Sequence, residues 1–479
     1  MNDSIFNKAV AASKWSALAE ISSKVISPLI FVILARLLTP NDYGVVAVAA
    51  IVISFSQVFW DVGLGKALIQ REDQVEESAN VVFWTNLVLG ILIYVILYFS
   101  AEGIASLFKS TESIPVLRVQ GIQIVLASLC SVQTALYQRD LNFRTLFWVR
   151  LITSALPGLA SIPIAIMGYG YWALVGGTLL GSLAQLLVLW KASSWRPRLS
   201  YDRDLARQLL GFGLWVMAEG LLAWFYVWVD SMIVGAYLGP NDLGLYRTGN
   251  SFVQMVFGLI LSPLMPVLFS MFSRIQHDID LLRKGLLVVS KLITMIALPS
   301  GIGLLLVADP LADVLLGAKW IGVAQVIGIL GLTNGISWLV GANAEVYRAM
   351  GRPDLNTKIM FSTLAVYTLA YIWAAPQGLT VFLWTRLGVI FIAIPVHLFV
   401  VKKYLRISPF NFMIDSRWIF IGCAFMAGAV WVIGISTEYM LDIVKLTICI
   451  ISGILIFSLF LLPEKEFVKR IVTFATRGV

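Results

Sequence analysis

Long apolar stretches constrain this chain more than any other feature of its sequence. Residues 81–99 and 443–462 are two stretches dominated by apolar side chains, and each is close to the roughly 20 residues that a helix needs to cross a bilayer. A membrane-spanning β-strand would instead alternate apolar and polar residues over about ten positions. Because lipid cannot satisfy an unpaired backbone group, only helices and closed barrels span it. The sequence therefore predicts an all-α, polytopic membrane protein.

The composition extends this conclusion to most of the chain. Of 479 residues, 59% are hydrophobic and only 13% are charged, whereas a soluble domain carries roughly 25% charged residues. The loops between apolar stretches are short, so we expect no separate soluble domain, and we see no secretory signal peptide. We predict about 14 transmembrane helices, at 14–37, 43–64, 79–100, 115–137, 145–168, 170–190, 207–237, 243–271, 286–307, 321–347, 357–375, 378–401, 416–435 and 441–462.

The basic residues predict the orientation of these helices. The net charge is +8, but the basic side chains lie at helix ends rather than in one patch, which argues against nucleic-acid binding. Most of them fall in loops on one side of the predicted membrane, and the other side carries only Arg36, Lys109, Arg247 and Lys319. Cytoplasmic loops are enriched in Lys and Arg. Both termini are therefore predicted to be cytoplasmic, which requires an even number of spans.

An internal repeat predicts how the spans are grouped. Residues 38–44 (LTPNDYG) are matched by 238–244 (LGPNDLG), Trp15 and Trp215 keep the same offset, and RDLN at 139–142 is matched by PDLN at 353–356. The repeats begin six spans apart, so they are predicted to be parallel and related by an axis along the membrane normal. We predict an N-terminal six-helix lobe (1–190), a cytoplasmic linker (191–206), a C-terminal six-helix lobe (207–406) and two additional spans with a cytoplasmic tail (407–479).

Polar side chains at helical spacing predict a cavity between these lobes. Intramembrane polar residues are costly and usually face a cavity or one another. Stripes occur in predicted spans 1, 2 and 4 and in the equivalent spans 7, 8 and 10. The residues predicted to line a substrate cavity are Glu20, Lys24, Asp61, Glu219, Asp230, Arg247, Asn250, Gln254, Glu345, Arg348, Arg150 and Lys291.

Each of these assignments has a structural alternative. The stripes could be polar contacts between packed helices, although that explains Asp61, Glu219 and Asp230 less well than serines and glycines. Glu20 and Lys24 are four residues apart and could simply neutralise each other. Arg118, Arg150, Lys291 and Arg386 could receive a phosphate group or extend to the lipid headgroups.

Signatures of catalysis are missing from the sequence. It has no phosphate-binding loop of the Walker type and no zinc-binding helix motif. Its two histidines, His277 and His397, lack partners at metal-ligand spacing. The acidic pairs Asp202/Asp204 and Asp278/Asp280 precede helices, where aspartate caps free amides. We therefore predict no enzyme activity, no metal and no cofactor, and transport driven by an ion gradient, the membrane potential or the substrate's own gradient.

Several segments resemble a known family. They are KWSA at 14–17, LARLL at 34–38, DVGLGKALIQR at 61–71, DSMIVG at 230–235, LGLY at 243–246 and GAKW at 317–320. In order and spacing they resemble the polysaccharide transporter family of the multidrug/oligosaccharidyl-lipid/polysaccharide exporter superfamily, and within it exporters of the colanic-acid and teichuronic-acid type.

The resemblance implies a flippase of the bacterial inner membrane. It implies a polyprenyl-pyrophosphate-linked oligosaccharide as substrate, for exopolysaccharide, O-antigen or capsule biosynthesis, with the lipid tail staying in the membrane and basic cavity residues holding the pyrophosphate. The intramembrane charges are mixed rather than purely basic, so the acids could instead carry a coupling H⁺ or Na⁺. Candidate protein partners are a polysaccharide polymerase and chain-length proteins.

Three other functions stay open at this point. A small-molecule exporter of the same superfamily would have a narrower cavity whose acids face an organic cation. A polymerase or ligase of envelope polysaccharide assembly would be expected to carry a large outer loop, which this sequence lacks. A structural scaffold would not need polar stripes in matched spans.

Overall fold

The structure is a computed structural model, and it describes residues 26–465 except 62 and 263, together with Trp15, Ser22 and Lys24. All regular secondary structure in this part is helical, which confirms the predicted class. The described residues form two compact units, one ending at Arg247 and the other beginning at Thr248. The division into lobes at 191–206 stays a prediction.

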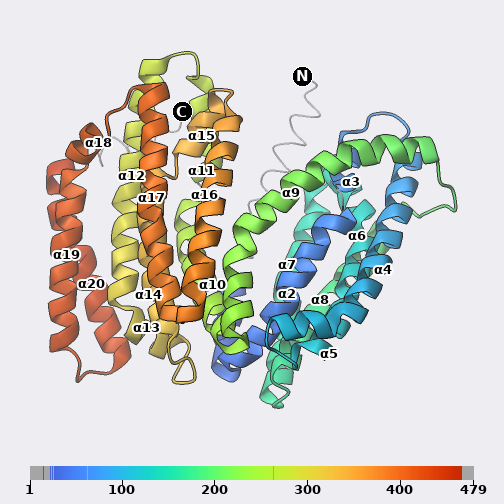
Figure 1. The fold of residues 1–479 in the computed structure, drawn as a ribbon, viewed down its shortest axis with the longest axis horizontal. Helices are drawn as coiled ribbons and strands as arrows, with labels where there is room; N and C mark the ends of the chain where they lie inside the picture. The colour runs from blue at the N-terminus through green and yellow to red at the C-terminus, as the bar shows by residue number, and fades with distance from the viewer. Residues whose placement is uncertain are drawn as a thin grey trace. The chain divides into compact units, whose positions relative to one another are not determined.

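The first unit packs the early helices into one bundle (Figure 1). After the short helix Ile26–Leu37 it contains α2 (Pro40–Asp61), α3 (Leu64–Gln70), α4 (Val75–Leu107), α5 (Ser113–Gln120), α6 (Ile122–Arg139), α7 (Phe143–Ile166), α8 (Tyr171–Ala192), α9 (Arg203–Leu238) and the first turns of α10 (Pro240–Leu261). Figure 1 shows α9, in green, as a long curved helix. Its first turns bury Leu205 and Leu209 in a core that includes Leu68 of α3 and Phe83 of α4.

The second unit holds the remaining helices. They are α11 (Leu264–Arg274), α12 (Ile279–Leu306), α13 (Ala308–Leu315), α14 (Val323–Ser337), η1 (Trp338–Val340), α15 (Asn343–Ala349), α16 (Pro353–Ala374), η2 (Ala375–Gln377), α17 (Leu379–Leu405), α18 (Pro409–Asp415), α19 (Arg417–Ser436), α20 (Asp442–Phe460) and η3 (Leu462–Glu464). Helices α12 and α14 approach closely because Gly301 and Gly335 meet where they cross, a use of small residues typical of membrane helices.

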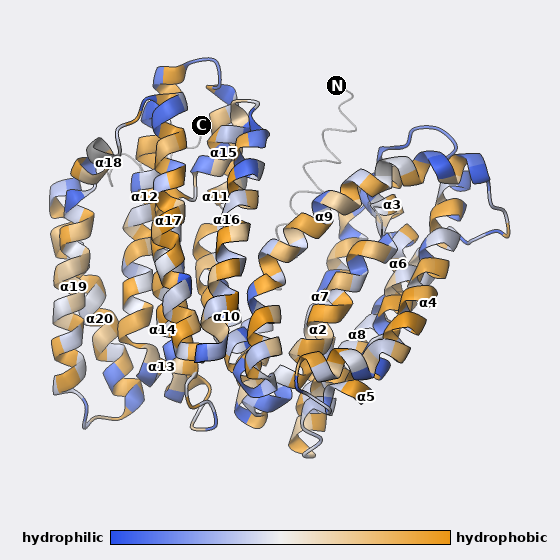
Figure 2. Cartoon of the chain, viewed as in Figure 1, coloured by the Kyte–Doolittle hydropathy of each residue, from blue (hydrophilic) through white to orange (hydrophobic). Residues whose placement is uncertain are grey.

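Twelve helices of the described part are long and apolar enough to cross a membrane. They coincide with twelve of the predicted spans, and Figure 2 shows that hydrophilic residues gather at the helix ends. The expectation of about 14 is met only in part. The eighth predicted span is divided into α10 and α11, of which α10 carries Arg247, Asn250 and Gln254 and α11 has only 11 residues. Most of the first predicted span lies outside the described residues.

The repeated motif marks a reciprocal helix contact. Both copies place a proline at the first position of a helix, Pro40 in α2 and Pro240 in α10, where proline's missing N–H costs nothing. A Cβ added at Gly44 would overlap the carbonyl of Pro240, and one added at Gly244 would overlap the carbonyl of Pro40. Each helix thus contributes one glycine and one proline carbonyl to the contact. A two-fold axis generates a reciprocal contact of this kind. The two copies of the motif therefore form a symmetric contact, and the parallel arrangement of the repeats stays a prediction.

The segment between α8 and α9 is fixed on α4. The backbone N–H of Arg198 donates to Oδ1 of Asn80 at 2.8 Å, and its carbonyl accepts from Nε1 of Trp84 at 2.8 Å. Asn80 is only 4% exposed, so these bonds form partly out of contact with solvent. The backbone N–H and carbonyl of Arg198 thereby attach the segment before α9 to α4.

Candidate transport cavity

A polar cavity lies between α2 and α9 in the first unit. It measures about 480 Å³, within the range of small-ligand pockets. Residues from three helices line it: Ser54, Gln57, Val58 and Asp61 of α2, Lys66 of α3, and Val216, Met217, Glu219, Gly220, Ala223, Trp224, Val227 and Trp228 of α9, with Gly63 between α2 and α3. Two residues that the sequence predicted for a cavity, Asp61 and Glu219, therefore line the same one.

Helical spacing explains how α2 presents its polar side chains. Ser54, Gln57 and Asp61 are three and four residues apart, so they lie on one face of the helix. Gly220 and Ala223 of α9 line the same cavity, and a Cβ added at Gly220 would be in ordinary van der Waals contact with Val58, at 3.4 Å. The small residues of α9 thus leave room beside the carboxyl and amide groups of α2.

Two tryptophans of α9 complete the wall of the cavity. Nε1 of Trp224 donates to Oγ of Ser54 at 3.0 Å, and its ring lies 4.7 Å from that of Phe55. The Trp228 ring has the guanidinium of Arg247 stacked on it, with Cζ 4.1 Å from the ring centroid. Neither tryptophan was predicted as a site residue from the sequence, because an aromatic residue in an apolar helix is usually expected to face lipid or the protein core. The sequence feature that could have indicated them is the aromatic-rich segment 224–228, which follows the polar residue Glu219 in the same predicted span.

Asp230 lies close by but is not among the residues that line this cavity. Its side chain is only 6% exposed. Oδ2 accepts a hydrogen bond from the Tyr246 hydroxyl at 2.7 Å, and Oδ1 accepts one from the Ser231 hydroxyl at 3.0 Å. Nη1 of Arg247 donates to the same Ser231 hydroxyl at 3.4 Å. Asp230 and Arg247 therefore belong to one buried network that connects α9 with the start of α10.

The other predicted cavity residues are dispersed. Glu20 lies outside the described residues, Lys24 is helical and half-buried, and Arg150 is exposed on α7. In the second unit, Arg348 pairs with Glu345 at 2.9 Å and Lys291 pairs with Glu464 at 2.8 Å.

Two polar residues of α10 in the second unit were also predicted to line a cavity. Nε2 of Gln254 donates to Oδ1 of Asn334 at 3.4 Å, and Oδ1 of Asn250 is buried with no hydrogen-bond partner in the part of the chain that the structure describes. Asn334 lies in the tenth predicted span, so this bond joins two of the spans predicted to carry polar stripes, within one unit.

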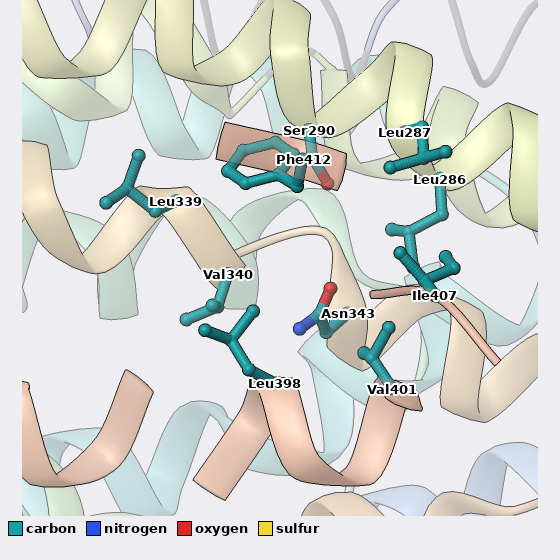
Figure 3. Close-up of a pocket in the computed structure, with 10 residues that line it drawn as sticks. All are labelled: Leu286, Leu287, Ser290, Leu339, Val340, Asn343, Leu398, Val401, Ile407 and Phe412. Carbon is teal, nitrogen blue, oxygen red and sulfur yellow. The ribbon is translucent and has the colours of Figure 1, made fainter. Parts of the chain in front are cut away.

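The second unit contains cavities of a different chemistry. One of about 450 Å³ is lined mainly by apolar side chains of α12, α19 and α20, among them Met295, Met426 and Phe457. Figure 3 shows a smaller one, of about 30 Å³, in which Ser290 and Asn343 are surrounded by apolar side chains. The smaller cavity has room for about one water molecule, and it lies where the predicted tenth span breaks between η1 and α15.

The described residues contain no group of three or more potential metal ligands. The two acidic pairs cap helices, as predicted: Oδ1 of Asp202 accepts from the backbone N–H of Asp204 at 2.9 Å, and Oδ1 of Asp278 accepts from that of Asp280 at 2.9 Å. The three cysteines are buried thiols. These acids and thiols therefore have structural explanations.

Comparison with solved structures defines the class of protein. The lipid II flippase MurJ, in an inward closed conformation, superposes with a TM-score of 0.75 and 16% identity over 95% of this chain and 99% of that one. An inward-facing multidrug resistance transporter of the MATE family superposes with a TM-score of 0.61 and 14% identity over 80% of this chain and 95% of its own. At these identities the likeness shows the fold alone, which is an all-α polytopic membrane fold like that of MurJ and the MATE transporter.

Sequence comparison identifies the family. The family model described as "Polysaccharide biosynthesis protein" matches residues 33–325. The succinoglycan biosynthesis transport protein ExoT of Rhizobium meliloti (strain 1021) is 29% identical over 67% of this chain, and the match spans 65% of that relative, just under two thirds of its length. The teichuronic acid biosynthesis protein TuaB of Bacillus subtilis (strain 168) is 24% identical over 78% of each chain. The lipopolysaccharide biosynthesis protein WzxC of Escherichia coli (strain K12) is 24% identical over 74% of this chain and 73% of its own.

The chain belongs to the Wzx-type polysaccharide biosynthesis and export family. The predicted family resemblance is confirmed. This is a family of membrane transporters and not of enzymes, so the prediction that the chain is not an enzyme is confirmed as well.

Proposed function

We propose that this protein is a flippase that moves a polyprenyl-pyrophosphate-linked oligosaccharide across the bacterial inner membrane for polysaccharide biosynthesis. The observation that carries the proposal is the cavity lined by Asp61, Glu219 and Gln57 in a unit made of membrane-spanning helices. Polar and charged groups are expensive to place in apolar surroundings. A cavity of this kind is useful to a protein whose cargo has a large hydrophilic part, and family membership supports such a cargo.

The division of the substrate into two parts suggests a mechanism. The glycan and pyrophosphate cross through a polar path, while the polyprenyl tail stays in the surrounding lipid, where no protein pathway is needed. Two parallel six-helix lobes, 1–190 and 207–406, rock about the substrate so that access alternates between the two sides. The reciprocal contact between the two copies of the repeated motif supports this internal symmetry.

The finer topology is part of the proposal. Helix α10, despite its polar residues, serves as the eighth of 14 spans, and the stretch ending at Leu37 as the first. With 14 spans and most basic residues in loops on one side, both termini are cytoplasmic. The driving force is a coupling H⁺ or Na⁺ gradient, the membrane potential or consumption of the flipped substrate, and a polysaccharide polymerase and chain-length proteins act next to it.

Deletion of the gene in its host tests this function. We expect the lipid-linked repeat unit to accumulate on the cytoplasmic side and the surface polysaccharide to be lost, and a plasmid copy to restore both. The extracted lipid then identifies the glycan. Unchanged lipid pools and unchanged polymer, in a host without a redundant exporter, would contradict the proposal and favour a small-molecule exporter, which drug-sensitivity assays would reveal.

A further inference from the structure

We propose that the cavity between α2 and α9 is a glycan subsite, which holds sugar hydroxyls of the transported headgroup and excludes its pyrophosphate. This inference rests on the proposed flippase function and assigns one part of the substrate to one set of residues. It makes Asp61, Glu219, Gln57 and Trp228 determinants of glycan binding.

The charges that line the cavity argue against a phosphate. Asp61 and Glu219 contribute two carboxylates, and Lys66 is the only cation among the described residues that line the cavity. Phosphate oxygens placed here would face negative charge in a partly enclosed space, where like charges repel more strongly than in water. Carboxylates accept short, charge-assisted hydrogen bonds from hydroxyl groups, and sugars carry many hydroxyls. The cavity therefore matches the uncharged part of the headgroup.

The polar side chains of the cavity differ in whether they already form hydrogen bonds within the protein. Ser54 accepts from Trp224 and donates to the carbonyl of Ile51 at 2.8 Å, so its role is to hold the indole. Gln57 is exposed, and its amide both donates and accepts. An amide beside two carboxylates can bind neighbouring hydroxyls as donor and acceptor in turn.

The two indoles supply the apolar part of such a site. A pyranose ring has flat faces made of C–H groups, and an indole offers a large apolar surface of matching shape. Trp224 is only 7% exposed, and its hydrogen bond to Ser54 fixes the ring. Trp228 lines the same cavity and is braced by the stacked guanidinium of Arg247. Both rings are thus oriented before any ligand arrives, which lowers the entropic cost of binding.

Cysteine protection tests the subsite directly. Ala223 is exposed, lines the cavity and lies between Glu219 and Trp228 along α9, whereas the three native cysteines are buried. We would place Ala223→Cys, or Leu214→Cys as a control on the same helix, in the full-length protein in nanodiscs. Leu214 is 54% exposed and lies outside the cavity lining. The rate of maleimide labelling is measured with lipid-linked oligosaccharide extracted from the deletion host, with polyprenyl pyrophosphate that carries no sugar, and with Na⁺ alone.

We expect the glycan-bearing lipid to slow labelling of Ala223→Cys severalfold, and the bare polyprenyl pyrophosphate and Na⁺ to leave the rate unchanged. Adding Glu219→Gln or Trp228→Ala should remove the protection, and Leu214→Cys should show none. Equal protection by bare polyprenyl pyrophosphate would overturn the assignment in favour of a phosphate site. Protection by Na⁺ alone would overturn it in favour of a cation site.

Failure of this inference is distinguishable from failure of the proposed function. If the wild-type gene restores polymer in the deletion host but a folded Ala223→Cys protein gains no protection from the glycan-bearing lipid, the subsite is wrong and the flippase stands. Val227→Cys, at a second exposed position of the lining, repeats the measurement should Ala223→Cys unfold. If the wild-type gene restores nothing, the function itself is contradicted.

Discussion

At the level of single residues, two intramembrane charges that the sequence marked as substrate ligands have specific protein partners. Asp230 is held by the hydroxyls of Tyr246 and Ser231. Lys291 forms an ion pair with Glu464 in which both side chains are at most 15% exposed. Since breaking a buried pair leaves one uncompensated charge, such residues are sensitive to substitution even when they never touch substrate. Loss of transport in a variant of either residue therefore needs a stability control.

Replacing Lys291 alone should destabilise the protein. Lys291→Met leaves the Glu464 carboxylate buried without its partner, and a loss of about 3–5 kcal/mol is typical of such a change. The double variant Lys291→Met/Glu464→Met should recover most of this loss, because both charges are removed. Thermal unfolding in detergent measures both, with Lys402→Met as an exposed control on α17. A single variant as stable as wild type would mean that the pair contributes nothing.

At the level of helices, the contact between α2 and α10 depends on two glycines. Gly44 and Gly244 each lie against a backbone carbonyl, which cannot move aside as a flexible side chain could. The two repeats therefore require glycine at the same place for the same reason. This explains why the motif recurs with its proline and glycine intact, whereas the position before each glycine is Tyr43 in one copy and Leu243 in the other.

Gly44→Ala should destabilise the first unit. The added methyl group overlaps the carbonyl of Pro240, and overpacking of this kind typically costs about 1–3 kcal/mol. The matched control is Gly103→Ala on α4, where a Cβ would meet nothing within 4 Å and a gain of about 0.5–1 kcal/mol is expected from helix propensity. The melting temperature and membrane yield of both variants check this. A melting temperature of Gly44→Ala at or above that of wild type would contradict the close approach.

The helices were predictable from the sequence to the extent that hydropathy defines them. Twelve spans were predicted correctly because each is a long apolar stretch. The break between η1 and α15 was not predicted, because residues 338–342 differ little in apolarity from their neighbours. Polar stripes at helical spacing predicted that Asp61 and Glu219 line a cavity, and the two residues line the same one. The pairing of Lys291 with Glu464 could not be predicted, because the two residues are 173 positions apart and no local pattern joins them.

At the level of the whole molecule, the lipid-linked oligosaccharide flippase that we propose has its polar cavity between α2 and α9 of the first unit. Family membership rests on the match over residues 33–325, and the fold on the likeness to MurJ. The cavity of the first unit is polar and that of the second is mainly apolar, so the polar headgroup of such a substrate is matched by the first. The central claim is that this chain alone moves such a lipid between leaflets.

Reconstitution tests that claim most directly. Purified protein and lipid-linked oligosaccharide from the deletion host are placed in sealed liposomes, and a membrane-impermeant glycosidase is added outside. We predict that nearly all of the glycan becomes cleavable in liposomes that contain the protein, and that only the outer-leaflet share is cleaved in protein-free liposomes. If an imposed ion gradient is required, H⁺ and Na⁺ gradients of either direction are tested in turn. Cleavage limited to the outer-leaflet share under every gradient, with folded protein present, would contradict the account.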